Sequence, residues 1–208
     1  MREPTAFSFR DDVAHIAKFL AAQASPVHLV GHSYGGLIAL LAAREDPSRI
    51  RSLTVYDPVA FGTLDPTIDA DALATLARVA VPWGSTEDDH DRWLASFVDY
   101  WGGDGAWEVL RDDARAEFRR VGWVVYQGVT TLSRDTTPAS DYAVIGARTL
   151  LLTGERTPLA ARRVIERLAK ALPDAQVITI AGAGHMGPLT HPAVDEAVAG
   201  FITDRSPG

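Results

Sequence analysis

The sequence predicts an α/β fold: a parallel sheet of about four strands flanked by helices, with a helical insertion between its halves. Short strand-like runs alternate with helical patterns in residues 1–61 and again in 141–208, as is typical of parallel sheets. Residues 62–140 instead show helical periodicity with few strand-like runs. We therefore predict a core formed by 1–61 and 141–208, and a helical cap or lid formed by 62–140.

The first part of the core reads as helix, strand, helix and strand. The expected elements are a helix at 8–23, a strand at 27–30, a helix at 34–45 and a strand at 50–56. The second of these helices is apolar on nearly all sides, so we expect it to be buried.

The middle segment contains three helical patterns, at 70–79, 87–100 and 106–120, and an ambiguous strand-like run at 123–126. All five tryptophans of the chain lie here. For each of them, we expect a place in the apolar core of the cap itself.

Regular alternation then returns in the last part of the chain. We expect a strand at 148–153, a helix at 159–172, a strand at 176–180, a glycine-rich loop at 181–187 and a final helix at 192–203.

Composition excludes several classes of protein. The 208 residues suit one domain, and a net charge of −7 argues against a nucleic-acid or anionic-membrane surface. The absence of cysteine excludes disulfides and cysteine-ligated metals. No apolar run is long enough to cross a bilayer, and the N-terminus does not read as a signal peptide. We expect a cytoplasmic protein with a small-molecule substrate and with neither cofactor nor metal.

A candidate nucleophile lies between the first strand and the buried helix, in Gly31-His32-Ser33-Tyr34-Gly35. A sharp strand-to-helix turn strains the backbone at Ser33 and exposes its hydroxyl, with flanking glycines relieving close approaches. The N–H of Tyr34, at the start of the helix, would point at a developing oxyanion. The competing interpretation is that Ser33 only caps the helix.

Among the six histidines, His185 fits best as the base, because it lies in the glycine-rich loop directly after the last strand. His32 precedes the serine and is expected to point away from it, and His90 is expected in a solvated turn. Three glycines around His185 spell G-x-G-x-x-G, but Pro188 interrupts the helix that a dinucleotide site requires.

Two acids could orient His185. Asp57 ends the second strand and Glu155 follows the third, so both lie at the edge of the sheet where the base is expected. Asp57 is shorter and more rigidly placed, and we prefer it while keeping Glu155 as the alternative.

Three segments resemble the α/β-hydrolase superfamily: GHSYGG at 31–36, LLLTGER at 150–156 and AGAGHMGP at 181–188. The resemblance extends over essentially the whole chain and implies a serine hydrolase in which Ser precedes His. Many relatives carry an acid where this chain has Thr157. Others place it after the strand that follows the helix beginning at the elbow, which is the strand-to-helix turn at Ser33, and this is the position of Asp57.

The resemblance also implies that strands are missing. The family's sheet usually has eight strands with the elbow after the fifth, so the resemblance implies that roughly the first 70 residues of a hydrolase are absent. That part normally supplies the second oxyanion donor. The strand at Val27 would then lie at the edge of the sheet, and a partner or a homodimer could cover it.

The expected function is cleavage of a small, fairly apolar ester or related acyl compound by Ser33, His185 and Asp57, with Tyr34 at the oxyanion. The alternative is a non-catalytic ligand-binding or interaction protein that keeps the elbow by descent. Cofactor-free lyase, peracid or C–C hydrolase chemistry at the same residues is a smaller alternative within enzymes.

Overall fold

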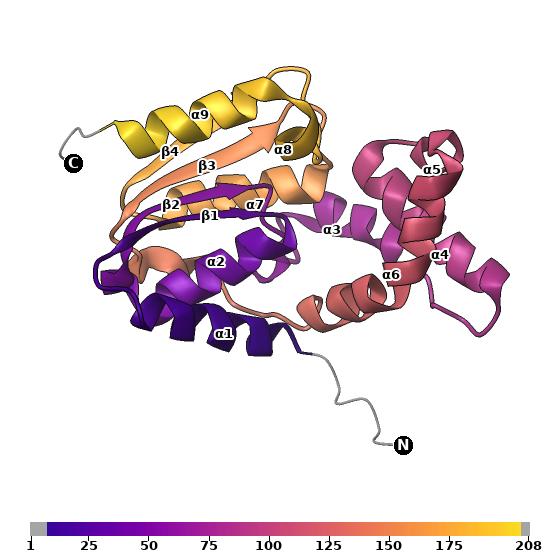
Figure 1. Cartoon of the computed structure of the whole chain (residues 1–208), viewed down its shortest axis with the longest axis horizontal. Coiled ribbons are helices and arrows are strands. Elements are labelled where there is room, and N and C mark those ends of the chain that lie inside the picture. The colour runs from indigo at the N-terminus through magenta and orange to yellow at the C-terminus, as the bar shows by residue number, and fades with distance from the viewer. Residues whose placement is uncertain (1–7, 205–208) are drawn as a thin grey trace.

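A computed structural model describes residues 8–204 and contains one four-stranded parallel sheet. The strands lie side by side in the same order as in the sequence (Figure 1). They are β1 (Val27–His32), β2 (Ile50–Tyr56), β3 (Arg148–Gly154) and β4 (Ala175–Ile180). The prediction of a parallel sheet of about four strands is therefore confirmed.

Helices cover both faces of the sheet (Figure 1). One face carries α1 (Phe9–Ala21), α2 (Tyr34–Glu45) and α7 (Leu159–Ala171), and the other carries α9 (Pro192–Thr203). Because α2 is apolar on nearly all sides, it lies buried between the sheet and α1, as expected. Short helical turns complete the core: η1 (Pro47–Arg49), η2 (Phe61–Thr63), η4 (Ala139–Val144) and α8 (Gly187–Thr190).

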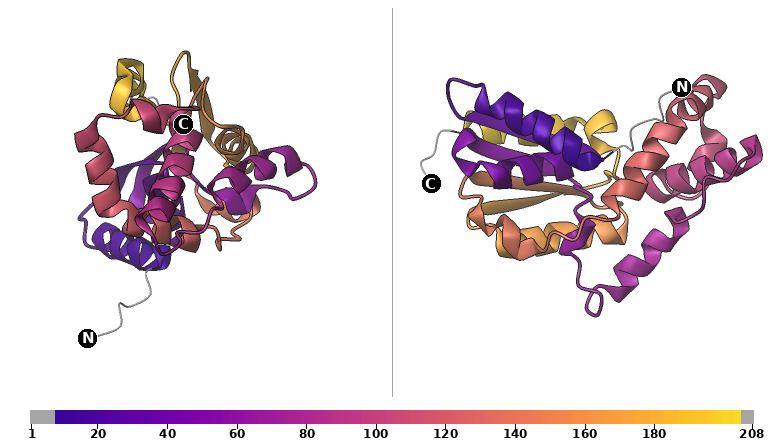
Figure 2. Two further views of the ribbon diagram at one scale, coloured as in Figure 1. Left: turned by 90° about the vertical axis from the view of Figure 1, so that its right-hand side faces the viewer. Right: turned by 90° about the horizontal axis from the view of Figure 1, so that it is seen from below.

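The chain between β2 and β3 forms a group of helices beyond the carboxyl ends of the strands (Figures 1 and 2). These inserted helices are α3 (Ala70–Leu76), η3 (Ala77–Val79), α4 (Glu87–Gly102), α5 (Ala106–Val109) and α6 (Asp112–Leu132). The ambiguous strand-like run at 123–126 lies within α6 and is helical. The division of the chain into a core and a cap stays a prediction.

The inserted helices have a small apolar core of their own. Trp93 and Trp107 are buried in it, and Trp83 packs at its margin. Trp123 is 49% exposed, although its ring contacts that of Trp83. Trp101 differs from the other four, because it packs against the main core of the protein and not against that of the inserted helices.

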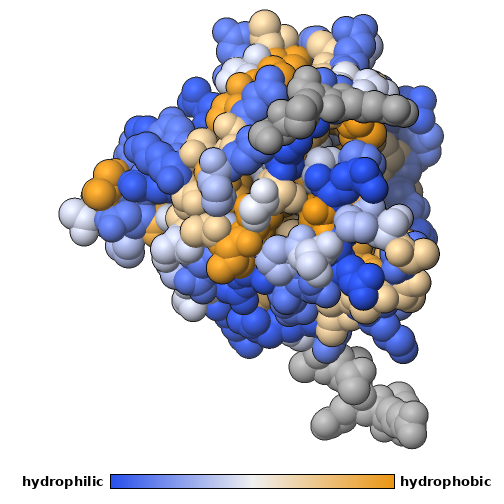
Figure 3. Space-filling model, turned by 90° about the vertical axis from the view of Figure 1, so that its left-hand side faces the viewer, coloured by the Kyte–Doolittle hydropathy of each residue, from blue (hydrophilic) through white to orange (hydrophobic). Residues whose placement is uncertain are grey.

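Strand β1 is an edge strand in the part of the chain described here, since it pairs with β2 alone. Val30 on this strand is 51% exposed. The end of the molecule away from the inserted helices is mostly hydrophilic, with small apolar patches (Figure 3). Between residues 8 and 204, no helix has both the length and the apolar character needed to cross a membrane.

Candidate active site

Ser33 lies in a strained turn between β1 and α2. Its backbone angles are φ 53° and ψ −119°, a region that residues other than glycine rarely adopt. Backbone hydrogen bonds hold the turn in place: Ser33 N–H donates to the carbonyl of Tyr56, and the carbonyl of Ser33 accepts from the N–H of Val59. The turn is therefore fixed by the end of the neighbouring strand β2.

Two glycines make this turn sterically feasible. A Cβ on Gly31 would lie 2.5 Å from the carbonyl oxygen of Gly35, and one on Gly36 would lie 3.0 Å from Cβ of Pro58. A Cβ on Gly35 would meet nothing within 4 Å. The second close approach, expected at Gly35, occurs at Gly36, where α2 meets the residue pair that follows β2.

The structure brings together three of the residues predicted for the site. Nε2 of His185 lies 2.9 Å from Oγ of Ser33, and Nδ1 lies 3.3 Å from Oδ2 of Asp57. His185 and Asp57 are buried, with 3% and 0% exposure. The contact between Nδ1 and Asp57 is within ion-pair distance but is not aligned as a hydrogen bond. Such contacts often tighten only when substrate is bound.

Asp57 is held by Thr157, whose role could not be predicted from the sequence. The Thr157 hydroxyl donates to Oδ2 of Asp57 over 2.7 Å and accepts from the N–H of Gly154 over 3.2 Å. Asp57 itself has φ of 42°, the second strained non-glycine residue of the described chain. Thr157, in the loop after β3, thus holds a carboxylate that follows β2.

The alternative acid, Glu155, is exposed and makes a different contact. Its carboxylate accepts a hydrogen bond of 2.8 Å from the N–H of Gly182. It therefore links the loop after β3 to the loop that carries His185. The geometry favours Asp57 over Glu155 as the partner of the His185 ring.

His32 does not point away from the site, contrary to the expectation. Its Nε2 lies 2.8 Å from the carbonyl oxygen of His185, and the two ring centroids are 4.9 Å apart. Nε2 is the donor in this contact, because a carbonyl oxygen can only accept. Burial, and to a lesser extent the nearby charge of His185, lowers the pKa of His32. The Tyr56 hydroxyl donates to the carbonyl of Gly184 over 2.7 Å. Both side chains anchor the loop that presents His185.

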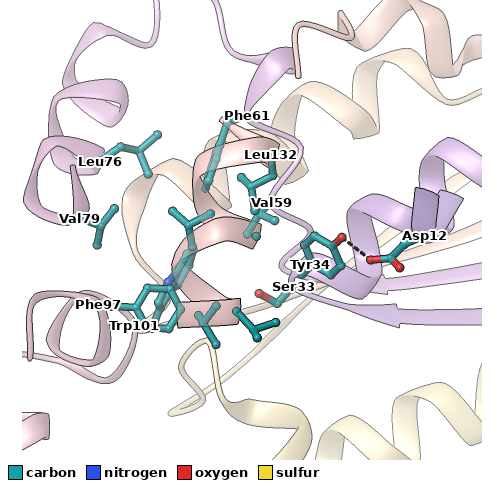
Figure 4. Close-up of a pocket in the computed structure, with 14 residues that line it drawn as sticks. Asp12, Ser33, Tyr34, Val59, Phe61, Leu76, Val79, Phe97, Trp101 and Leu132 are labelled. Carbon is teal, nitrogen blue, oxygen red and sulfur yellow. Dashed lines mark hydrogen bonds between the residues drawn. The ribbon is translucent and has the colours of Figure 1, made fainter. Parts of the chain in front are cut away.

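Tyr34, the first residue of α2, has two features at the site. Its N–H lies at the N-terminus of a buried helix, where backbone amides favour negative charge. Its hydroxyl donates to Oδ2 of Asp12 over 2.6 Å (Figure 4). Burial, and then this carboxylate, raises the pKa of Tyr34. The bond joins α1 to the elbow and fixes the position of the ring.

A cavity of about 390 Å³ opens beside Ser33. Figure 4 shows Ser33 facing side chains of the inserted helices across it. Most of the lining is aliphatic or aromatic: Val59, Phe61, Leu76, Val79, Phe97, Trp101, Val124, Val125, Val129 and Leu132. Trp101 closes one side, and its ring stacks on that of His185 with centroids 3.8 Å apart and planes 28° apart.

Trp101 could have been singled out only by its contacts, because five tryptophans share the same segment.

His90 was expected in a solvated turn, but it lies within α4. Its ring stacks on that of Trp83, with the ring centroids 4.4 Å apart. Across residues 8–204, the structure places no group of three or more histidine and acidic side chains that could hold a metal ion.

Comparisons with known proteins agree with this architecture. A hydrolase from Pseudomonas aeruginosa has a TM-score of 0.72 at 21% identity, covering 97% of this chain and 74% of that one. A hydrolase from Oleispira antarctica has a TM-score of 0.67 at 18% identity, covering 95% of this chain and 73% of that one. A structure from a study of carboxylesterases of Nitrososphaera gargenis has a TM-score of 0.63 at 15% identity, covering 97% and 74%. These likenesses show the fold.

Sequence comparison identifies the family. An uncharacterised protein of Synechocystis is 44% identical over 50 residues, which span 24% of this chain and 20% of that protein. The model of the alpha/beta hydrolase family matches residues 2–197, nearly the full length of the chain. The chain therefore belongs to the alpha/beta hydrolase family.

Proposed function

We propose that the chain is a serine hydrolase that cleaves a small, fairly apolar ester or related acyl compound. The observation that carries this proposal is the contact of 2.9 Å between Oγ of Ser33 and Nε2 of His185, at a strained elbow beside an apolar cavity. A serine hydroxyl is a weak nucleophile unless a base takes its proton as it attacks. In this proposal, His185 acts as that base.

The reaction would proceed in two halves. Oγ of Ser33 attacks the ester carbonyl carbon while its proton passes to Nε2 of His185, giving a tetrahedral oxyanion. The N–H of Tyr34 stabilises that oxyanion, and Asp57 stabilises the His185 imidazolium. Collapse of the intermediate breaks the bond to the alcohol oxygen, which takes the proton from His185. Water then repeats the sequence on the acyl-enzyme, releasing the acid and restoring Ser33.

The lining of the cavity supports an apolar acyl group. Its side chains are mainly aliphatic and aromatic, and a ligand gains free energy there by removing apolar surface from water. The structural likeness to the protein from the carboxylesterase study supports ester chemistry by analogy of fold.

A fluorophosphonate probe tests the proposed nucleophile. We expect the probe to label the native chain at Ser33, identified by peptide mass, and to leave Ser33→Ala unlabelled. Ser25→Ala is the matched control, because Ser25 lies in an exposed loop before β1 and should not affect labelling. Failure to label Ser33, with ester turnover unchanged in Ser33→Ala, would refute the proposal and favour the non-catalytic alternative.

A further inference from the structure

A second depression lies on the other side of Trp101. Its volume is about 570 Å³, and its lining includes His185, Arg78, Asp104 and Arg156. The apolar cavity beside Ser33 is called the acyl chamber below, and the second depression is called the polar chamber. Trp101 lines both of them. The indole that stacks on His185 therefore borders both an apolar space and a polar one.

The charged side chains that line the polar chamber differ in whether they form an ion pair or only hydrogen bonds. Arg78 forms an ion pair with Asp104, and Asp99 accepts a hydrogen bond of 2.8 Å from the N–H of Trp107. Arg156 donates to the carbonyl of Gly182. It forms no ion pair with any residue in the described part of the chain. The polar chamber therefore offers an exposed guanidinium, that of Arg156, which is not held in an ion pair among the described residues.

The proton transfers of the proposed reaction indicate which chamber would hold the acyl part of an ester and which would hold its alcohol part. His185 must deliver its proton to the departing alcohol oxygen, so the alcohol leaves on the side of its ring. The polar chamber adjoins His185, whereas the acyl chamber adjoins Ser33, which keeps the acyl group after the alcohol departs. The two halves of the substrate thus meet surfaces of opposite character.

We propose that the site takes esters that join an apolar acyl group to a polar alcohol bearing hydroxyl groups, with Trp101 separating the two halves. This inference rests on the proposed serine hydrolase function and goes beyond it by naming the alcohol. Arg156 recognises the alcohol oxygens, and a hydrogen bond from a charged donor contributes more than one between neutral groups. The apolar side chains of α6 select the acyl group.

The experiment compares kcat/KM for four esters, formed from octanoic or acetic acid with either glycerol or butanol. We expect the glycerol ester of octanoic acid to be preferred over its butyl ester by about tenfold. Arg156→Gln should remove most of that preference. Arg162→Gln is the matched control, because Arg162 is an exposed residue of α7 outside both chambers and should leave the preference unchanged.

A second pair of variants tests the acyl chamber. Val129 lines it from α6, so Val129→Phe should lower the ratio of octanoate to acetate turnover by about tenfold or more. Ala116 lies on the exposed surface of the same helix, so Ala116→Phe adds bulk outside the chamber and should leave the ratio unchanged. Trp101→Ala removes the side chain that lines both chambers and should lower both preferences, whereas Trp123→Ala should lower neither.

The outcomes separate this inference from the function on which it rests. Labelling of Ser33 and turnover of all four esters without preference would overturn the inference and leave the hydrolase proposal intact. A preference for the butyl ester, or a glycerol preference that survives in Arg156→Gln, would also overturn it. Absence of both labelling and turnover would overturn the two together.

Discussion

The hydroxyl of Thr157 provides a direct test of how Asp57 is held. Thr157→Val keeps the size and branching of the side chain but removes the donor to Oδ2 of Asp57 and the acceptor for the N–H of Gly154. Asp57 is fully buried, and its Oδ1 has no hydrogen-bond partner among residues 8–204. The bond from Thr157, at 2.7 Å, is thus the carboxylate's one aligned hydrogen bond in the described structure.

The expected cost follows from these two lost contacts. A hydrogen bond to a charged group contributes about 1.5–3 kcal/mol, and leaving the buried N–H of Gly154 unpaired adds about 1 kcal/mol. We therefore expect Thr157→Val to lower the free energy of unfolding by about 3 kcal/mol. The loosened Asp57 should also orient His185 less well, lowering kcat/KM by about tenfold.

Urea unfolding and ester kinetics measure these two effects. Thr157→Ser is the control, since it keeps the hydroxyl and loses only a methyl group, at a cost of about 1 kcal/mol. Both variants should keep the native dependence of unfolding free energy on urea concentration. If Thr157→Val matched Thr157→Ser in stability and kcat/KM, the hydroxyl would not be what holds Asp57.

Three further predictions concern the elbow and its surroundings. Relief of backbone strain should make Ser33→Gly about 1 kcal/mol more stable to urea than Ser33→Ala, and equal stabilities would contradict the strain. Gly31→Ala should lower the free energy of unfolding by about 2 kcal/mol, because its Cβ would lie 2.5 Å from a carbonyl oxygen, whereas Gly35→Ala should not; thermal unfolding distinguishes them. Burial lowers the pKa of His32 below its ordinary value of 6.5, so the unfolded chain binds the proton first as the pH falls. Stability should therefore decrease from about pH 6.5 down to the lowered pKa, and melting temperatures should show a smaller decrease in His32→Gln; an identical decrease would exclude His32 as its cause.

The sheet and its flanking helices could be predicted from the sequence because their apolar patterns have clear periods and end at proline or glycine. The run at 123–126 was ambiguous for a physical reason. Valine and aromatic side chains favour strands locally, but here they lie within α6, where Val125 and Tyr126 pack into the core of the inserted helices. Packing against the other inserted helices determines that this run is helical rather than extended. The local sequence pattern does not indicate that packing.

The candidate site, too, could be predicted only in part from the sequence. Ser33 and His185 could be named because each lies in a loop of distinctive composition after a strand. The choice between Asp57 and Glu155 could not be settled, because any residue that follows a parallel strand reaches the same edge of the sheet. Thr157 lies 100 residues from Asp57, and no local pattern indicates their contact. The same holds for Trp101 on the ring of His185.

The arrangement of the site has a consequence for the order of folding. Ser33, Asp57, Thr157 and His185 each follow a different strand, and 152 residues separate the first from the last. Since β4 lies at the far edge of the sheet, the pairing of Ser33 with His185 requires all four strands to be in register. Covalent labelling of Ser33 during refolding would then report the docking of the last strand. Tryptophan fluorescence would report separately on the inserted helices, because all five indoles lie between residues 83 and 123.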